Sequence, residues 1–400
     1  MVPEGWRECQ VGELLSSPPQ NGYSPVEADE WTGLSVLSLA ALTGVSLDTN
    51  LIKYAPDLPQ VRNALLCPGD LLISRANTPD KVGRSALFRG GAENLSYPDL
   101  MMRARVNVDV ADENYVAYLL QSYPVLKRLQ RRAAGTSASM VKLTKGAVET
   151  LKVTVPPRDT QSNIARMLAA WDQAIETVDK LIVTARAQKK ALMQQLLTGK
   201  RRLPGFEGAW QQMRLRERFT ERGERATGDE PLLSITMSRG VILHAEAGRK
   251  DSSNDDKSKY KVLRQGDIGY NTMRMWQGAS ALSSLDGIVS PAYTVVTPNE
   301  AMDAEFAAYL FQLPRTVHDF RRYSQGLTSD TWNLKFPAFG AIKVKVPEIA
   351  EQRRIAAILN TADNQIRELA EVQLRLSDEK RALMQQLLTG KRRVKVEEAA

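Results

Sequence analysis

The feature that most constrains this chain is a twelve-residue sequence that occurs twice. The letters ALMQQLLTGKRR run from Ala191 to Arg202 and again from Ala382 to Arg393, so the copies are offset by 191 residues (382 − 191). An identity of this length within one chain indicates an internal repeat, which has to be recognised before any other pattern is interpreted. The fold must therefore contain two copies of one structural unit.

The same offset relates residues upstream of the identical segment. Equivalent residues of the first and second copy are Tyr118 and Tyr309, Val153 and Val344, Gln161 and Gln352, Ile164 and Ile355, Leu168 and Leu359, and Asp172 and Asp363. These parts match without a gap, whereas the beginnings of the two copies have diverged. We therefore predict two related units with a shared last part and different first parts.

The shared part is predicted to be a long helix. Residues 159–198 contain no Gly or Pro and are rich in strong helix formers. Apolar residues alternate in steps of four and three, which is a heptad seam, with Lys189 and Lys380 as interruptions at equivalent positions. Each helix should have about forty residues and a length of roughly 60 Å. Two such helices with matching seams should pack on each other.

The diverged parts carry short apolar runs bounded by Gly, Pro, Asn and Asp, which is typical of strands joined by turns. Residues 114–132 have helical spacing that Pro124 interrupts. This mixture predicts an α+β fold class with two α/β domains. The predicted division is a first domain at 1–155, a first long helix at 156–202, a second domain at 203–346, and a second long helix with a tail at 347–400.

Composition excludes several classes of protein. Cys9 and Cys67 are far apart, which argues against a disulfide scaffold and for a reducing compartment. We find no signal peptide and no apolar run that could cross a membrane, so we expect a cytoplasmic protein without membrane contact. The net charge of +8 fits nucleic-acid binding and ordinary surface charge equally well.

The residues needed for catalysis are missing. His244 and His318 are the only histidines, and no Cys/His cluster exists, which excludes a histidine triad and a zinc site. No G-x-G or G-x-x-x-x-G-K-[ST] loop is present. Ser290 to Tyr293, SPAY, only loosely resembles a methyltransferase motif, and we interpret it as a turn. We therefore expect no catalytic residues, no metal and no cofactor in this chain.

Four phrases resemble the specificity subunit of type I restriction-modification systems. They are PGDLLISR at 68–75, VPPRDTQSNIARMLAAWDQAI at 155–175, VPEIAEQRRIAAILNTADNQI at 346–366, and the LLTGKRR helix ends. The resemblance covers essentially the whole chain. One departure is Thr160, which stands where the second copy has the more family-like Glu351.

This resemblance implies a non-catalytic DNA-recognition subunit. In the family, each diverged domain is a target recognition domain that reads one half of a bipartite DNA site. The two helices form an antiparallel coiled coil that sets the spacing, giving an internal pseudo-two-fold repeat. The implied partners are double-stranded DNA, two adenine-N6 methyltransferase subunits and, through them, ATP-dependent restriction subunits. S-adenosylmethionine, ATP and Mg are then expected on the partners.

Candidate DNA-binding residues come from polar loops beside predicted strands, because loops on a rigid scaffold commonly carry binding residues. In the first domain they are Ser74, Arg75, Asn77, Lys81, Arg84, Thr136, Ser137 and Lys142, and in the second Asn271, Arg274, Gln277, Gln325, Thr328 and Ser329.

Two other functions compete with this interpretation. The chain could be a stand-alone coiled-coil DNA-binding protein without enzyme partners. It could also be a methyltransferase or nuclease itself, against which the missing cofactor loop argues.

Overall fold

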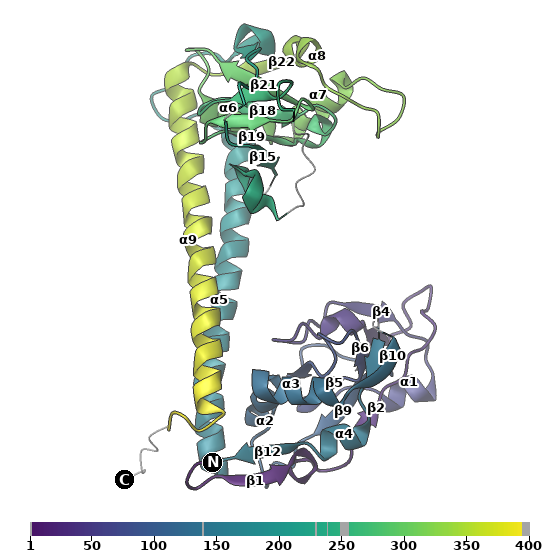
Figure 1. The fold of residues 1–400 in the computed structure, drawn as a ribbon. Helices are drawn as coiled ribbons and strands as arrows, with labels where there is room; N and C mark the ends of the chain where they lie inside the picture. Colours follow the sequence, from purple (N-terminus) through teal and green to yellow (C-terminus); the bar gives the residue numbers. More distant parts are fainter. Residues whose placement is uncertain (1, 138–139, 229, 238, 249–255, 394–400) are drawn as a thin grey trace. The chain divides into compact units, whose positions relative to one another are not determined.

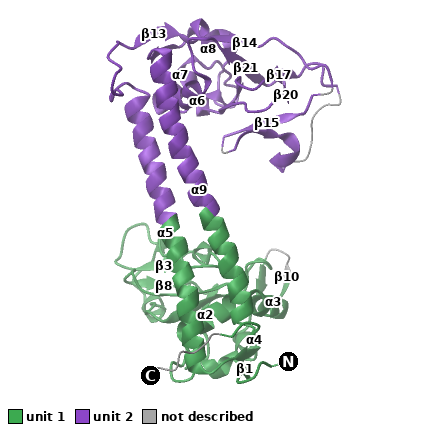
Figure 2. Cartoon of the chain, turned by 90° about the vertical axis from the view of Figure 1, so that its left-hand side faces the viewer, with its two compact units in different colours: residues 1–178, 372–400 green, residues 179–371 purple. Residues whose placement is uncertain are grey.

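The computed structural model consists of two compact units, which Figure 2 colours separately. Unit 1 comprises residues 1–178 and 372–400, and unit 2 comprises residues 179–371. Two helices of 39 residues, α5 (Arg158–Leu196) and α9 (Ile349–Leu387), correspond to the two long helices that the sequence predicted. Each of them contributes to both units. The structure describes residues 2–137, 140–228, 230–237, 239–248 and 256–393.

Unit 1 is built on a four-stranded antiparallel sheet in the order β2-β9-β5-β7 (Figure 1). Smaller sheets have the orders β4-β3-β8, β10-β11-β6 and β1-β12. Its strands are β1 (Arg7–Gln10), β2 (Gln20–Asn21), β3 (Ser35–Leu37), β4 (Ile52–Tyr54), β5 (Asp70–Ser74), β6 (Ala76–Asn77), β7 (Ser85–Leu87), β8 (Leu95–Ser96), β9 (Met101–Arg105), β10 (Ala134–Ser137), β11 (Met140–Lys142) and β12 (Lys152–Val155). Its shorter helices are η1 (Val11–Leu14), η2 (Leu39–Ala41), α1 (Pro59–Asn63), α2 (Glu113–Gln121), α3 (Tyr123–Arg132) and α4 (Lys145–Glu149).

Unit 2 repeats this plan with a four-stranded antiparallel sheet in the order β14-β21-β18-β19. The pairs β13-β22, β15-β16 and β17-β20 are also antiparallel. Its strands are β13 (Gln211–Arg214), β14 (Phe219–Glu221), β15 (Leu233–Thr236), β16 (Gly240–Leu243), β17 (Lys261–Leu263), β18 (Ile268–Asn271), β19 (Ser280–Leu282), β20 (Gly287–Val289), β21 (Tyr293–Pro298) and β22 (Lys343–Val346). Its shorter helices are η3 (Leu215–Glu217), η4 (His244–Ala247), η5 (Met275–Gln277), α6 (Ala304–Phe311), α7 (Pro314–Tyr323) and α8 (Phe336–Ala341).

The segment 114–132, predicted as one interrupted helix, is two helices. Helix α2 ends at Gln121, the extended residue Ser122 follows, and α3 begins at Tyr123. Pro124 therefore lies in the first turn of α3, where a helix has no use for the missing N–H. In unit 2, α7 begins with Pro314, and Gln312 and Leu313 separate it from α6.

A repeated glutamine ties the start of each long helix to the domain before it. The side chain of Gln161 accepts a hydrogen bond of 3.0 Å from the backbone N–H of Asp112 and donates one of 2.9 Å to the carbonyl of Pro156. Asp112 in turn caps α2. Gln352 makes the same two bonds, each of 2.9 Å, to Asp303 and to the proline before α9. Both glutamines are buried, so each is a structural part of the junction.

The helices α5 and α9 run antiparallel within each unit. In unit 1, Ile164 near the beginning of α5 shares a buried cluster with Leu387 and Leu388 at the end of α9. In unit 2 the ends are exchanged, and Leu196 near the end of α5 shares a cluster with Ile355 near the beginning of α9.

The two lysines that interrupt the apolar seam are ion-paired across the helices. In unit 1, Lys380 Nζ lies 2.5 Å from Asp172 Oδ1, and the Tyr118 hydroxyl donates a 2.6 Å hydrogen bond to Oδ2 of the same carboxylate. Lys380 Nζ also lies 5.1 Å from the centre of the Tyr118 ring. Burial and the hydrogen bond to Asp172 raise the pKa of Tyr118, so its phenol remains a proton donor.

Unit 2 contains the same cluster of Tyr, Asp and Lys. Lys189 Nζ lies 2.6 and 2.7 Å from the two carboxylate oxygens of Asp363, and the Tyr309 hydroxyl donates a 2.6 Å bond to Asp363. Each lysine therefore completes a partly buried polar cluster with a residue of the other helix. The lysine in each apolar seam therefore forms an ion pair that joins the two helices, and it does not disrupt their packing.

The departure from the family pattern at Thr160 has a structural counterpart. Glu351 is fully buried and receives Nε and Nη2 of Arg202, each at 2.8 Å. Thr160 offers no carboxylate, and the equivalent arginine, Arg393, instead reaches Glu4 at 3.2 Å. The basic end of α5 is thus partly used inside unit 2, and Arg202 is not free to bind phosphate.

Candidate nucleic-acid interface

The sheet β10-β11-β6 brings together the two predicted binding loops of unit 1. Lys142 in β11 pairs with Ala76 in β6 and with Ala134 in β10. The backbone N–H of Leu143 donates a 2.8 Å hydrogen bond to the carbonyl of Arg75. Residues separated by more than sixty positions in the sequence therefore form one continuous surface.

The cations of this surface differ in how freely they can reach a ligand. Lys81 and Lys142 are exposed and form no ion pair or side-chain hydrogen bond within the described chain. Arg75 donates from Nη1 to the carbonyl of Asp99 at 3.1 Å, and Arg84 donates to the carbonyl of Thr43 at 3.2 Å. Both arginines are half-buried and are held by backbone groups, so each presents its remaining donors from a fixed position.

The uncharged candidates of unit 1 lie at the edge of the same surface. Ser74 is fully buried, and its hydroxyl accepts a 3.2 Å hydrogen bond from the side chain of Asn77. Ser74 therefore positions Asn77, which is half-buried in β6. Thr136 and Ser137 belong to β10, but their side chains fall outside the described structure.

Unit 2 joins its two predicted loops by an equivalent hydrogen bond. The backbone N–H of Leu334 donates a 2.8 Å bond to the carbonyl of Thr272, as Leu143 does to Arg75 in unit 1. The first loop contains Asn271, at the end of β18, and the exposed residues Arg274 and Gln277 at η5.

The second loop of unit 2 is a closed turn that presents polar groups. Gln325 pairs with Asn333 through two backbone hydrogen bonds of 2.9 and 2.8 Å. Between them, Thr328 is held by the hydroxyl of Thr331, which accepts its backbone N–H at 3.1 Å. Gln325, Thr328 and Ser329 are all exposed. Their loop lies beside the η5 loop, because Leu334 is hydrogen-bonded to Thr272 and the ring of Trp332 contacts that of Trp276.

An aromatic cluster between these loops was missed in the sequence. The rings of Trp276 and Trp332 meet edge to face at 5.4 Å, and the guanidinium of Arg321 lies 5.2 Å from the centre of the Trp332 ring. Half-exposed tryptophans beside arginine are a common platform for stacking bases. Trp276 lies between the predicted residues Arg274 and Gln277, so an aromatic next to polar candidates was the available signal.

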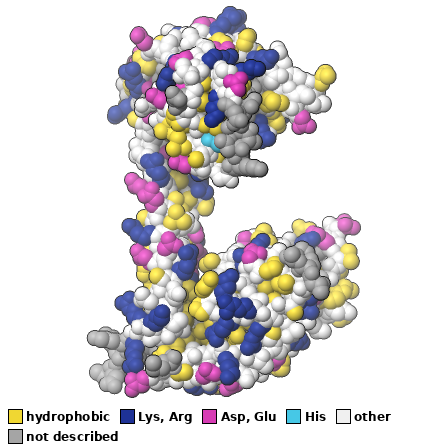
Figure 3. Space-filling model, in the orientation of Figure 1, with side chains coloured by type: hydrophobic (Ala, Val, Ile, Leu, Met, Phe, Trp, Pro, Cys, Tyr) yellow, Lys and Arg dark blue, Asp and Glu magenta, His cyan; other side chains and the backbone are white. Residues whose placement is uncertain are grey.

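Two basic helices border the candidate surfaces and were also missed. Helix α3 runs directly into β10, and α7 runs directly into the loop that begins after Tyr323. Figure 3 shows Lys and Arg side chains gathered over the place of α3. The exposed basic residues of the two helices are Lys127, Arg128, Arg131, Arg132, Arg315, Arg321 and Arg322. The signal in the sequence was the amphipathic spacing of these helices. Their apolar residues face the core of the unit and leave the basic residues exposed.

A buried aspartate supports the first loop in each unit. Asp70 is fully buried, accepts the backbone N–H of Cys67 at 2.8 Å and lies 2.6 Å from Nε of Arg105. Asp267 occupies the equivalent place and is paired with Arg222, also at 2.6 Å. The repeated Gly-Asp sequence thus forms a turn that fixes the strand, β5 or β18, which carries the candidate residues.

The described residues contain no group of three or more His, Cys, Asp or Glu side chains suited to holding a metal ion. No helix in the described ranges combines the length and the apolar character needed to cross a bilayer.

These features define a tandem-repeat protein in which each unit offers a polar, basic loop surface and two long helices are shared by both units. No protein-family model matches the chain. The MjaVIII specificity subunit of a type I restriction enzyme, from Methanocaldococcus jannaschii, is 24% identical to the chain over 418 residues, covering 98% of this chain and 94% of that protein.

Solved structures of type I restriction-modification proteins are also similar to this chain. The S subunit of a type I restriction-modification system from M. genitalium matches with a TM-score of 0.59 and 13% identity over 96% of both chains. Another solved chain of a type I R-M system matches with a TM-score of 0.58 and 17% identity over 98% of this chain and all of that one. At these identities the likeness concerns the fold. The resemblance to type I specificity subunits is confirmed, and so is a mixed α/β fold with long helices.

Proposed function

We propose that this chain is the DNA-recognition subunit of a type I restriction-modification complex. The observation that carries the proposal is the repeated hydrogen bond that joins two polar loops into one surface, Leu143 to Arg75 in unit 1 and Leu334 to Thr272 in unit 2. A subunit with two related but diverged surfaces can read the two different halves of a bipartite DNA site. The named relatives are restriction-enzyme specificity subunits, which favours this function over a stand-alone DNA-binding protein.

The division of labour along the chain follows from the same proposal. Target recognition is assigned to 1–155 and 203–346, and spacing to an antiparallel coiled coil formed by 156–202 and 347–400. Lys and Arg side chains would contact phosphates, and polar side chains would read base edges. The fourteen candidate residues predicted from the sequence form the proposed interface, with Ser74 as a positioning residue.

We extend the proposal to two methyltransferase subunits per chain. Val183 and Leu374 are equivalent under the 191-residue repeat, and their exposed fractions are 66% and 65%. Single exposed apolar residues are common on protein surfaces, so the repeat itself carries this step: a partner that docks on one copy can dock on the equivalent surface of the other. Restriction subunits would join through the methyltransferases. Catalysis, S-adenosylmethionine, ATP and Mg would then belong to the partners, and this chain would carry no catalytic residue.

The test is to express the chain with the methyltransferase gene adjacent to its own, and to sequence the methylated adenines. We expect one bipartite motif with an unspecified spacer, and native mass spectrometry of the purified complex should show two methyltransferase subunits per chain. A complex that saturates at one methyltransferase would contradict the stoichiometry. Methylation of a continuous motif would contradict bipartite reading.

The exposed cations Lys81, Lys142 and Arg274 should contribute phosphate contacts. Replacing each by Ala should flatten the slope of log affinity against log salt by about one, because one fewer counterion is released. The measurement is duplex binding by the complex between about 50 and 200 mM salt. Arg381→Ala is the matched control, since Arg381 is an exposed helix residue paired with Asp378 and outside the proposed interface. If the three variants keep the slope of the control, these loops do not contact phosphate.

A further inference from the structure

The surface proposed to read DNA in unit 2 contains apolar side chains among its polar ones. The indole rings of Trp276 and Trp332 meet edge to face at 5.4 Å, and both residues are half-exposed. Met273 precedes Trp276 by three residues and is 48% exposed. We call Met273, Trp276 and Trp332 the apolar cluster. It joins the two loops that carry the predicted DNA-binding residues of this unit.

The loop fixes the position of the apolar cluster and uses its polar atom. Trp276 Nε1 donates a 3.0 Å hydrogen bond to the carbonyl of Met273, so the indole N–H already has its partner within the loop. Met275, between these two residues, is completely buried and anchors η5 in the core of unit 2. Because its N–H is occupied, the ring of Trp276 offers a ligand only apolar surface.

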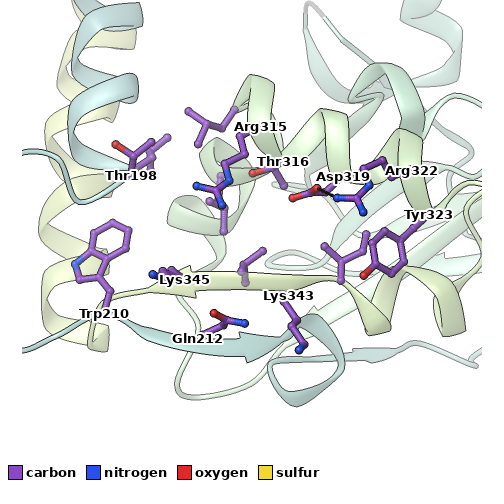
Figure 4. A pocket seen from close by; sticks show the side chains of 15 residues that line it. Thr198, Trp210, Gln212, Arg315, Thr316, Asp319, Arg322, Tyr323, Lys343 and Lys345 are labelled. Atoms are coloured by element: carbon purple, nitrogen blue, oxygen red, sulfur yellow. Dashed lines mark ion pairs between the residues drawn. The ribbon is translucent and has the colours of Figure 1, made fainter.

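Helix α7 supports the apolar cluster through Arg321. The guanidinium of Arg321 lies 5.2 Å from the centre of the Trp332 ring and covers one face of it. The opposite face of this helix lines a pocket with Arg315, Asp319 and Arg322 (Figure 4). Trp332 is thus braced by Arg321 and Trp276, and Met273 is the most exposed member of the cluster.

The equivalent loops of unit 1 contain no aromatic residue. They are residues 74–84 and 134–142, which the hydrogen bond from Leu143 to Arg75 joins. In the part of these loops that the structure describes, Met140 is the one large exposed apolar residue, with 42% of it exposed. The two tryptophans therefore belong to the diverged chemistry of unit 2 and do not follow from the repeated fold.

The kind of contact follows from what duplex DNA offers. Bases in a duplex are stacked, so a protein reaches their ring faces only after it opens a base step. The edges of the bases carry hydrogen-bonding groups and one apolar group, the 5-methyl group of thymine in the major groove. Trp276 lies in sequence between the exposed residues Arg274 and Gln277, which supply polar contacts beside it. An apolar cluster in this setting matches a thymine methyl group without distortion of the duplex.

We propose that the apolar cluster reads one thymine of the half-site bound by unit 2, with Met273 and Trp276 against its 5-methyl group. The inference rests on the proposed function and adds the chemical identity of one base and the residues that select it. The neighbouring polar side chains would read hydrogen-bonding groups, as proposed for the rest of the surface. Burial of one methyl group corresponds to about a fourfold gain in affinity.

The test replaces each thymine of the methylated motif, one at a time, by deoxyuridine, which lacks the methyl group and keeps every hydrogen-bonding atom. Binding of each duplex by the complex with the methyltransferase is then measured. We expect one position, within one half-site, at which the replacement weakens binding about fourfold. Met273→Ala and Trp276→Ala should bind the thymine and deoxyuridine duplexes of this position with nearly equal affinity. Circular dichroism checks that each variant is folded, and Met273→Ala alone decides if Trp276→Ala is not.

The matched control is Met140→Ala, which removes an exposed methionine from the equivalent surface of unit 1 and should keep the fourfold discrimination. A complex that methylates a bipartite motif but has no sensitive thymine, or one whose sensitivity Met273→Ala preserves, would overturn this inference alone.

Two further results would assign the apolar cluster to another role and would also overturn the reading of thymine. The first is a DNA bend, measured by fluorescence energy transfer, that the variants lose while no thymine is sensitive, because the cluster would then insert between bases. The second is loss of a methyltransferase subunit from the Met273→Ala complex in native mass spectrometry, which would indicate a protein contact. Absence of any bipartite motif would overturn the proposed function and this inference with it.

Discussion

Inserting one heptad into each long helix is expected to lengthen the spacer of the methylated motif by about three base pairs. The insertion points are after Lys180 in α5 and after Glu371 in α9, which are equivalent under the 191-residue repeat. Seven residues of heptad pattern keep the apolar seam in phase and add roughly 10 Å to each helix at 1.5 Å per residue. With about 3.4 Å per base step, this length corresponds to about three base pairs.

Both half-site sequences should be retained, because the loops that would read them are untouched. The added base pairs rotate the half-sites relative to each other by about a third of a turn, so we expect reduced activity together with the new spacing. The readout is sequencing of methylated adenines after expression with the methyltransferase. Insertion into α5 alone is the control and should abolish methylation, since its seam loses its match in α9. An active double insertion that still methylates the original spacing would show that the helices do not set the distance.

Asp172→Ala is expected to destabilise unit 1 by about 2–3 kcal/mol, whereas Lys380→Met should change its stability by less than about 1 kcal/mol. The difference follows from burial, because the side chain of Lys380 is 6% exposed and that of Asp172 is 38% exposed. Loss of the aspartate leaves a buried ammonium and the Tyr118 hydroxyl without their shared partner. Loss of the lysine leaves a carboxylate that water still reaches. Because Asp172 is partly hydrated, the destabilisation caused by Asp172→Ala should also stay below that for a fully buried ion pair.

Urea denaturation followed by circular dichroism gives the free energy of unfolding of each variant. Asp378→Ala removes an aspartate whose ion pair with Arg381 is exposed, and it should be nearly neutral. The pair Asp363 and Lys189 in unit 2 should show the same asymmetry. If Lys380→Met costs as much as Asp172→Ala, the buried ammonium is not the source of the effect.

The long helices could be predicted from the sequence because their signal is local. A segment without Gly or Pro and an apolar step of four and three residues specify a helix and its buried face at every turn. The family resemblance rested on the same kind of contiguous phrase, such as the Gly-Asp turn in which Asp70 begins β5. These features need no knowledge of distant parts of the chain.

The candidate surface could be predicted only in pieces. The sequence singled out Arg274 and Gln325 as polar loop residues, but neither loop reveals that Trp276 of one meets Trp332 of the other. The division of the helical segment at Ser122 was also open, because Pro124 is tolerated in a first turn and disruptive in a helix interior.

The sequence by itself determined the repeat, the two long helices and the resemblance to type I specificity subunits, since each depends on residues that lie close together in the chain. The tertiary structure decided which partners Lys189 and Lys380 have and which loops form one surface. The physical reason is that these arrangements depend on hydrogen bonds and ion pairs between residues far apart in sequence. In the sequence, a lysine in the heptad pattern looks like an interruption of the apolar seam. Only the folded structure shows that an aspartate of the other helix lies beside it.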